Sequence, residues 1–178
     1  MHEASPEFRP LSMAVLTLSD TRGVDEDRSG ALLCERLQAA GHHLAEREIL
    51  PDDRYRIRAV LSRWIADPAV QAVLTTGGTG FTGRDDTPEA VRPLLDAEVE
   101  GFGELFRQLS HAEIGSSTIQ SRALAGFANH TFIACLPGST GACRTAWDAI
   151  LADQLDVRHR PCNLAELVLF ANHGGGGA

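Results

Sequence analysis

Short, nearly continuous apolar runs alternate along the chain with segments in which apolar residues recur every three or four positions. Runs at 13–18, 72–76 and 131–136 are typical of strands buried on both faces of a parallel sheet. A more polar run at 43–50 predicts a strand nearer an edge. The pattern of apolar runs therefore predicts a parallel sheet.

Helices are predicted between these strands. After Asp53, apolar residues follow the 0, 3, 4, 7, 8 spacing of an amphipathic helix, which Asp53 can cap and Asp67-Pro68 ends. Thr87-Pro88 indicates another helix start, with Thr87 at the N-cap. The segment 160–170 fits either a last strand or a helix. Further helices are expected at 29–40, 103–113, 117–125 and 139–155.

This succession of strands and helices predicts an α/β fold in three layers, α/β/α, around a mostly parallel sheet. The length of 178 residues suits one domain, which we place at residues 12–172. The polar residues 1–11 are expected to form a flexible arm, and the glycine-rich residues 173–178 a disordered tail.

The charged residues restrict how the protein can bind an anion. Acidic residues number 24 and basic residues 16, for a net charge of −8, and every basic residue is arginine. The absence of lysine excludes Schiff-base chemistry and a P-loop of the GK[ST] type. The acidic balance argues against nucleic acid as a partner. Arginine, backbone N–H groups, helix N-termini or a metal ion must therefore hold any anionic ligand.

Cysteine and histidine show no metal-binding pattern. The cysteines lack C-x-x-C spacing and are expected to be buried thiols in a reducing compartment. His42 and His43 are expected to be solvated turn residues. Because the chain shows no signal-peptide core and no membrane-spanning apolar run, we expect a cytoplasmic protein without a membrane partner. The cysteines are Cys34, Cys135, Cys143 and Cys162.

Polar, turn-rich segments follow four predicted strands, at 19–22, 50–53, 75–80 and 136–140. The carboxyl ends of parallel strands meet at one edge of a sheet, so we expect these segments to form one ligand site. The residues expected to bind substrate or phosphate are Ser19, Asp20, Arg22, Thr76, Gly77, Gly78, Thr79, Gly80, Arg84, Pro137, Gly138, Ser139 and Thr140.

Two explanations stay open for several of these residues. The glycines at 77–80 can cradle a phosphate with backbone N–H groups, or they can simply permit a tight turn. Asp85 and Asp86 can provide oxygen ligands for a hard cation, or they can favour a helix N-terminus. Asp53 is the expected helix cap, which leaves Asp52 available for another role.

Other charged residues are expected to be solvated. The acidic run 25–27 fits a flexible loop better than a metal site. Arg56 and Arg58 are expected to face solvent.

Several long segments, in the same order, resemble one family. They are TTGGTGFTGRDDTPEA, EVEGFGELFRQLS, IGSSTIQSRALAGFAN and LPGSTGACRTAW. Together they resemble molybdenum cofactor biosynthesis proteins of the MoaB/MogA type, over about residues 10–163. The DVRHRPCN stretch and the length are closer to the MoaB branch.

The resemblance implies a molybdopterin-binding fold that assembles as a homo-oligomer, either a trimer or a hexamer formed as a dimer of trimers. It implies adenylyl transfer from Mg-ATP to molybdopterin, with ATP and molybdopterin as substrates and Mg²⁺ as cofactor. The catalytic and metal-binding residues would be Asp52, in the L-x-P-D segment, and Asp85, in the R-D-x-T-P segment. The alternative is a non-catalytic oligomer that binds molybdopterin or a nucleotide in the same pathway, with other biosynthesis proteins as possible partners.

One position departs from the family pattern. Many relatives carry lysine just after PGS[TQ], where this chain has Gly141. The cations expected at the site are therefore Arg22, Arg84 and Arg144, together with the metal ion.

Overall fold

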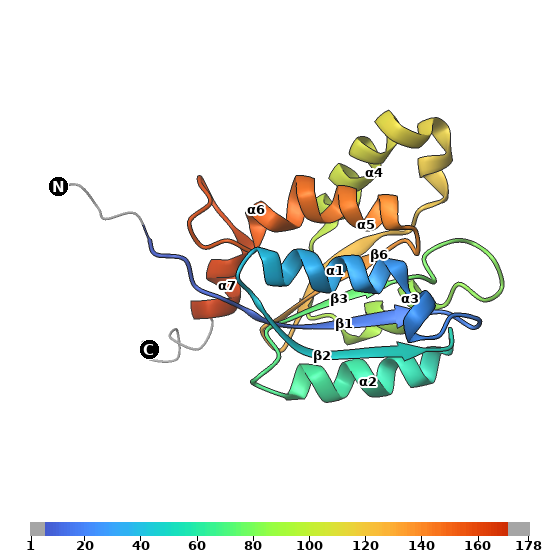
Figure 1. Ribbon diagram of the computed structural model, residues 1–178, viewed down its shortest axis with the longest axis horizontal. Coiled ribbons are helices and arrows are strands. Elements are labelled where there is room, and N and C mark those ends of the chain that lie inside the picture. Colours follow the sequence, from blue (N-terminus) through green and yellow to red (C-terminus); the bar gives the residue numbers. More distant parts are fainter. Residues whose placement is uncertain (1–5, 171–178) are drawn as a thin grey trace.

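Residues 6–170, which the computed structural model describes, contain a mixed six-stranded sheet (Figure 1). In the order β2-β1-β3-β6-β5-β4, the first four strands are mutually parallel, whereas β5 runs antiparallel to β6 and β4 to β5. The prediction of a mostly parallel sheet is confirmed. The strands are β1 (Ser12–Leu18), β2 (His43–Leu50), β3 (Ala72–Thr76), β4 (Ala97–Glu98), β5 (Leu124–Ala128) and β6 (Thr131–Leu136).

Helices cover both faces of the sheet, which confirms the three layers. Alternate side chains of a strand point to opposite faces. Accordingly, Met13 and Val15 of β1 join one apolar cluster, and Ala14 and Leu16 join the other. In Figure 1, α1 and α5 lie above the sheet and α2 below it. The first face carries α1 (Arg28–Ala39), α4 (Glu100–Ile114), α5 (Thr140–Ala146) and α7 (Leu164–Phe170), and the second carries α2 (Arg54–Ala66) and α3 (Thr87–Val91).

Helix starts follow local capping chemistry. The Asp53 carboxylate accepts the N–H groups of Tyr55 and Arg56 at 3.0 and 2.9 Å, as predicted for the cap of α2. The predicted cap at Thr87 is wrong by one residue, because Asp86 is the N-cap of α3. The Thr87 hydroxyl instead donates to the Gly77 carbonyl at 2.9 Å, which joins α3 to the end of β3.

The predicted helix at 117–125 is wrong in its second half. A 3₁₀ helix, η3 (Gly115–Gln120), is followed by β5, which pairs with β6 and whose Leu124 and Ala125 side chains are buried. Packing on a sheet face outweighs intrinsic propensity in such a short segment. The undecided segment 160–170 contains a helix, α7. The predicted helix at 139–155 is confirmed as a continuous stretch from Thr140 to Gln154, made of α5, η4 (Trp147–Leu151) and α6 (Ala152–Gln154).

Asp27 corrects the prediction of a solvated acidic loop. Its side chain is buried, caps α1 through the Gly30 N–H at 2.9 Å, and pairs with Arg47 at 2.9 Å. Burial by itself would raise the pKa of Asp27, but hydrogen bonds from Arg47, Thr17 and Gly30 and the Arg47 charge hold that pKa below its usual value. The first loop is therefore fastened to β2 by this ion pair.

His42 and Cys162 also differ from expectation. His42 is buried, and its Nδ1 accepts the Leu11 N–H at 3.0 Å, whereas His43 is exposed as predicted. Cys162 is exposed, whereas the other three cysteines are buried. Of the predicted arm, residues 1–5 lie outside the described residues, as does the predicted tail at 173–178, but Leu11 is buried and Phe8 contacts the His42 ring.

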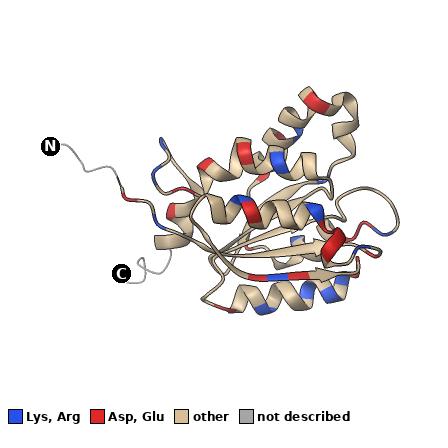
Figure 2. Cartoon of the chain, viewed as in Figure 1, with Lys and Arg blue, Asp and Glu red and all other residues tan. Residues whose placement is uncertain are grey.

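Two arginines of α2, Arg54 and Arg63, pair with acidic side chains, and Figure 2 shows charged residues along both α2 and β2. Arg63 forms ion pairs with Glu46, at 2.9 Å, and with Glu48. Arg56 is exposed as predicted, but Arg58 donates to the carbonyls of Ala90 and Glu89, which corrects its expected solvation. The arginines of α2 therefore have different surroundings, with Arg54, Arg58 and Arg63 bound to other residues and Arg56 exposed. Among residues 6–170, no helix is long and apolar enough to cross a membrane.

Candidate functional site

A cleft of about 590 Å³ opens at the carboxyl ends of β1, β2, β3 and β6. The chain leaves these strands through segments that include Ser19, Asp52, Gly77 and Pro137, and all four residues line the cleft. The sheet order changes direction here, because β2 lies on one side of β1 and β3 on the other. Ligands in open α/β sheets bind at such a switch point, so the predicted convergence of the four segments is confirmed.

The loop after β3, residues 77–80, crosses the centre of this edge. Gly77 has φ +108° and Gly78 has φ +66°, backbone conformations that favour glycine. The Gly77 N–H donates to the Leu136 carbonyl at 2.9 Å. A Cβ atom at Gly77 would lie 2.3 Å from the Leu18 carbonyl oxygen. Glycine is therefore required here both by conformation and by the close approach of β1.

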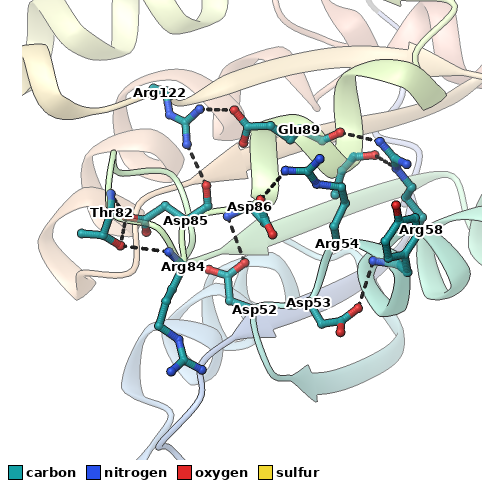
Figure 3. Close-up of polar contacts among 12 residues, drawn as sticks. Asp52, Asp53, Arg54, Arg58, Thr82, Arg84, Asp85, Asp86, Glu89 and Arg122 are labelled. Atoms are coloured by element: carbon teal, nitrogen blue, oxygen red, sulfur yellow. Dashed lines mark hydrogen bonds and ion pairs between the residues drawn. The ribbon is translucent and has the colours of Figure 1, made fainter.

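Asp52 lies against this loop. A Cβ atom at Gly78 would lie 2.4 Å from Asp52 Oδ2, and Asp52 Oδ1 accepts the Asp86 N–H at 3.2 Å (Figure 3). Burial raises the pKa of Asp52 to about 6, and the nearby charges of Asp85 and Asp20 act in the same direction, against the Asp86 hydrogen bond. A cation beside Asp52 would relieve this unfavourable negative charge.

We expect Asp52→Asn to stabilise the protein at pH 7.5 and not at pH 4. The unfolded-state pKa of aspartate is about 3.9, so the folded protein binds more protons between that value and about 6. Stability is therefore lost as pH rises through this window. Allowing for partial solvent screening, the gain on removing the charge is about 1 kcal/mol at pH 7.5. Urea unfolding at both pH values, with Asp53→Asn as the control, measures it; an equal gain at both would contradict it.

Asp85 lies against the other end of the loop. A Cβ atom at Gly80 would lie 2.8 Å from Asp85 Oδ2, and this oxygen accepts the Thr82 N–H at 2.7 Å and the Thr82 hydroxyl at 2.6 Å. Burial alone would raise the pKa of Asp85, but the hydrogen bonds from Thr82 and Gly80 and the Arg122 charge hold it below its usual value. Asp85 is therefore an ionised carboxylate at the cleft.

The charged residues that line the cleft are three aspartates and two arginines. Arg84 Nε pairs with Asp20 Oδ2 at 2.8 Å, and Arg22 Nη1 donates to the Gly138 carbonyl at 3.4 Å. Arg144, the third expected cation, is not among the lining residues and lies with Gly141 in a separate groove between α4 and α5. The arginines therefore do not by themselves balance the cleft's negative charge.

Most of the predicted binding residues line the cleft. Thr76 and Thr140 do not. Thr76 is buried, and its hydroxyl donates to the Pro137 carbonyl at 3.0 Å, so it supports the loops from below. The Ser139 hydroxyl oxygen caps α5 by accepting the Ala142 N–H at 3.1 Å. The predicted residues that line the cleft are Ser19, Asp20, Arg22, Asp52, Gly77, Gly78, Thr79, Gly80, Arg84, Asp85, Pro137, Gly138 and Ser139.

A further wall of the cleft was not predicted. It comes from α4 and η3 and combines apolar and hydroxyl-bearing side chains. These residues lie within or directly after helices rather than after a parallel strand, so the strand-end argument could not find them. The hydroxyl-rich sequence GSSTIQS at 115–121 was the available signal. The wall residues are Phe106, Ser110, Ile114, Ser117, Gln120 and Ser121.

Within residues 6–170, no three or more His, Cys, Asp or Glu side chains form a group that could hold a metal ion. Mg²⁺ is commonly held by one or two carboxylates together with substrate phosphates and water. Asp52 and Asp85, which flank one glycine loop at the cleft, meet that requirement. The donor set therefore fits a cation that arrives with a phosphate ligand.

The fold and cleft define an α/β protein with a ligand site at the carboxyl edge of its sheet, and comparison with known proteins gives the family. Residues 14–157 match the family described as "Probable molybdopterin binding domain". Molybdenum cofactor biosynthesis protein B of Escherichia coli (strain K12) is 57% identical over 163 residues, covering 92% of this chain and 96% of that protein. The chain belongs to the MoaB/MogA family of molybdenum cofactor biosynthesis proteins, on the MoaB branch.

Solved structures show the same fold. A crystal structure of a molybdenum cofactor biosynthesis protein B has a TM-score of 0.80 and 42% identity, covering 86% of this chain and 94% of that one. The tungsten cofactor synthesizing protein MoaB from Pyrococcus furiosus has a TM-score of 0.74 and 37% identity, covering 82% and 92%. The predicted resemblance, including the MoaB branch, is confirmed.

Proposed function

We propose that this protein adenylylates molybdopterin with Mg-ATP, before molybdate is inserted. The observation that carries the proposal is the pair Asp52 and Asp85, placed on either end of the glycine loop in a cleft whose lining arginines leave negative charge unbalanced. Two polyanionic substrates can meet in such a cleft only if further positive charge accompanies them. Membership of the molybdenum cofactor family supports the choice of molybdopterin as acceptor.

The reaction requires alignment more than covalent catalysis. An oxygen of the terminal phosphate of molybdopterin attacks the α-phosphorus of ATP, the bond from that phosphorus to the bridging oxygen breaks, and pyrophosphate leaves with the electron pair. Asp52 and Asp85 would hold Mg²⁺, which neutralises phosphate charge when bound. The loop 77–80 would present backbone N–H groups to phosphate, and Arg22 and Arg84 would add guanidinium donors at the rim.

The wall formed by α4 and η3 suits the less charged part of a substrate. Phe106 and Ile114 provide apolar surface, and Ser110 and Ser117 provide hydroxyl groups beside it. A flat heteroaromatic ring with polar edges is bound by that combination. We propose that this wall receives the pterin.

We also propose that the protein works as a homo-oligomer, a trimer or a dimer of trimers. Support comes from Phe81 and Ile119, which are 69% and 74% exposed and lie together along a second groove of about 550 Å³ beside the cleft. Large apolar side chains that gather on a surface are typical of an interface. Other molybdenum cofactor biosynthesis proteins are the expected further partners.

The test of the proposed function is direct. Purified protein is incubated with molybdopterin, ATP and Mg²⁺, and adenylated molybdopterin and pyrophosphate are quantified. We expect both products in equal amounts, and none after chelation of the metal. Binding of molybdopterin without either product would overturn the enzymatic proposal and favour a non-catalytic binding protein.

A further inference from the structure

Arg122 lies behind the cleft rather than in it. Its side chain is 19% exposed, and it is absent from the residues that line the cleft. It follows η3 and precedes β5, in the part of the chain where the sequence pattern predicted a helix. A guanidinium group in so covered a position requires partners for its donors.

Those partners belong to the two segments that carry the cleft's central loop and Asp85. Arg122 Nε donates to the Gly80 carbonyl at 2.8 Å, and Nη2 donates to the Asp85 carbonyl at 2.8 Å. The remaining arm, Nη1, forms an ion pair with Glu89 of α3 (Figure 3). One planar group thus fixes the distance between the glycine loop and the peptide of Asp85.

The backbone of Arg122 is held as firmly as its side chain. Its N–H donates to the Thr79 carbonyl at 2.9 Å. Arg107 of α4 donates to the carbonyls on both sides, Ser121 at 3.4 Å and Ala123 at 3.1 Å. The Phe81 ring lies under the guanidinium group, with its centroid at 4.9 Å. Arg122 therefore connects the α4–η3 wall to the glycine loop 77–80 and to Asp85.

We propose that Arg122 is a positioning residue, which holds Gly80 and Asp85 in the arrangement that binds the metal-bound phosphate. The expected effect on catalysis rests on the proposed function, whereas the hydrogen bonds from Arg122 to Gly80 and Asp85 are present in the free protein. A planar fork with several fixed donors can bridge two carbonyls and a carboxylate, which a lysine ammonium cannot do with the same geometry. Arg122→Lys is therefore expected to keep more of the order of the loop and more of the activity than Arg122→Met, but less than the wild type.

The first measurement needs no substrate. Hydrogen–deuterium exchange of the free protein is compared between the wild type, Arg122→Met and the control Arg92→Met. The control removes a surface arginine whose Nε lies 3.5 Å from Glu98 Oε2. We expect amides at 79–86 to exchange about 10-fold faster in Arg122→Met only. Unchanged exchange in that segment would overturn the inference.

The second measurement separates positioning from a general loss of stability. In the adenylylation assay, we expect Arg122→Met to raise the Mg²⁺ concentration needed for half-maximal rate and to lower kcat about 10²-fold, with KM for molybdopterin changed less. If Arg122→Met does not fold, Glu89→Gln replaces it in the assay. This variant keeps the side-chain shape, and we expect it to show the same changes in kcat and Mg²⁺ dependence more weakly. A uniform loss in all parameters, or wild-type values, would overturn the inference.

The two proposals fail separately. If the wild type makes no adenylated product, the proposed function fails, and the exchange experiment still decides whether Arg122 orders the loop. If the wild type is active and Arg122→Met keeps its kcat and Mg²⁺ dependence, the inference on Arg122 fails and the proposed function stands.

Discussion

Replacing Asp85 by asparagine is expected to lower the rate of adenylylation by at least about 10³-fold. The amide has the same shape, and its oxygen can still accept the Thr82 N–H and hydroxyl that now bind Asp85 Oδ2. What it loses is the negative charge that the site maintains, since Thr82, Gly80 and Arg122 together hold the pKa of Asp85 below its usual value. The effect should therefore fall on metal-dependent chemistry, with little change in fold.

Single-turnover formation of adenylated molybdopterin measures this effect. Asp53→Asn is the matched control, because its carboxylate caps α2 outside the cleft and asparagine caps equally well. We expect the control to retain wild-type rates and thermal stability. Near-normal turnover by Asp85→Asn would remove Asp85 from the proposed metal site.

Gly77→Ala is expected to destabilise the folded protein by about 3 kcal/mol and to abolish ligand binding. The new Cβ atom would lie 2.3 Å from the Leu18 carbonyl oxygen, and backbone cannot move aside as a flexible side chain can. The φ of +108° adds conformational strain for any residue with a Cβ atom. Relief requires β1 and β3 to separate at the switch point, so the loop 77–80 cannot keep its shape.

Urea unfolding and a binding titration with ATP measure the two parts of this effect. Gly83→Ala is the matched control, because a Cβ atom there meets nothing within 4 Å. We expect that control to change stability by less than about 0.5 kcal/mol. Equal stability of the two variants would show that the approach of Gly77 to β1 is not a constraint.

The parallel strands and the location of the cleft could be predicted because they depend on local patterns. Apolar runs identified β1, β3 and β6, and parallel topology requires their carboxyl ends to share an edge. Short-range chemistry also identified the cap at Asp53, which left Asp52 for the cleft. Prediction was weaker where pairing in the sheet decides a segment's structure, as for β5, which pairs with both β4 and β6.

Local sequence patterns could not predict which charged side chains are buried or which surface they face. Asp27 looked like part of a solvated acidic run, but Arg47 and Thr17 enclose it. Arg144, close in sequence to the segment 136–140, lies in another groove because α5 turns its side chain away from the cleft. Both errors arose because neighbours in sequence need not face the same surface.

The sequence by itself determined the α/β class, the four strand-end segments, the absence of lysine and the family. These follow from periodicity, composition and contiguous motifs, none of which depends on which residues meet in the fold. Only the tertiary structure decided that burial among other carboxylates raises the pKa of Asp52, that α4 and η3 complete the cleft, and that Arg122 bridges Gly80 and Asp85. These features depend on contacts between residues far apart in the chain, and such contacts exist only once the sheet has brought the segments together.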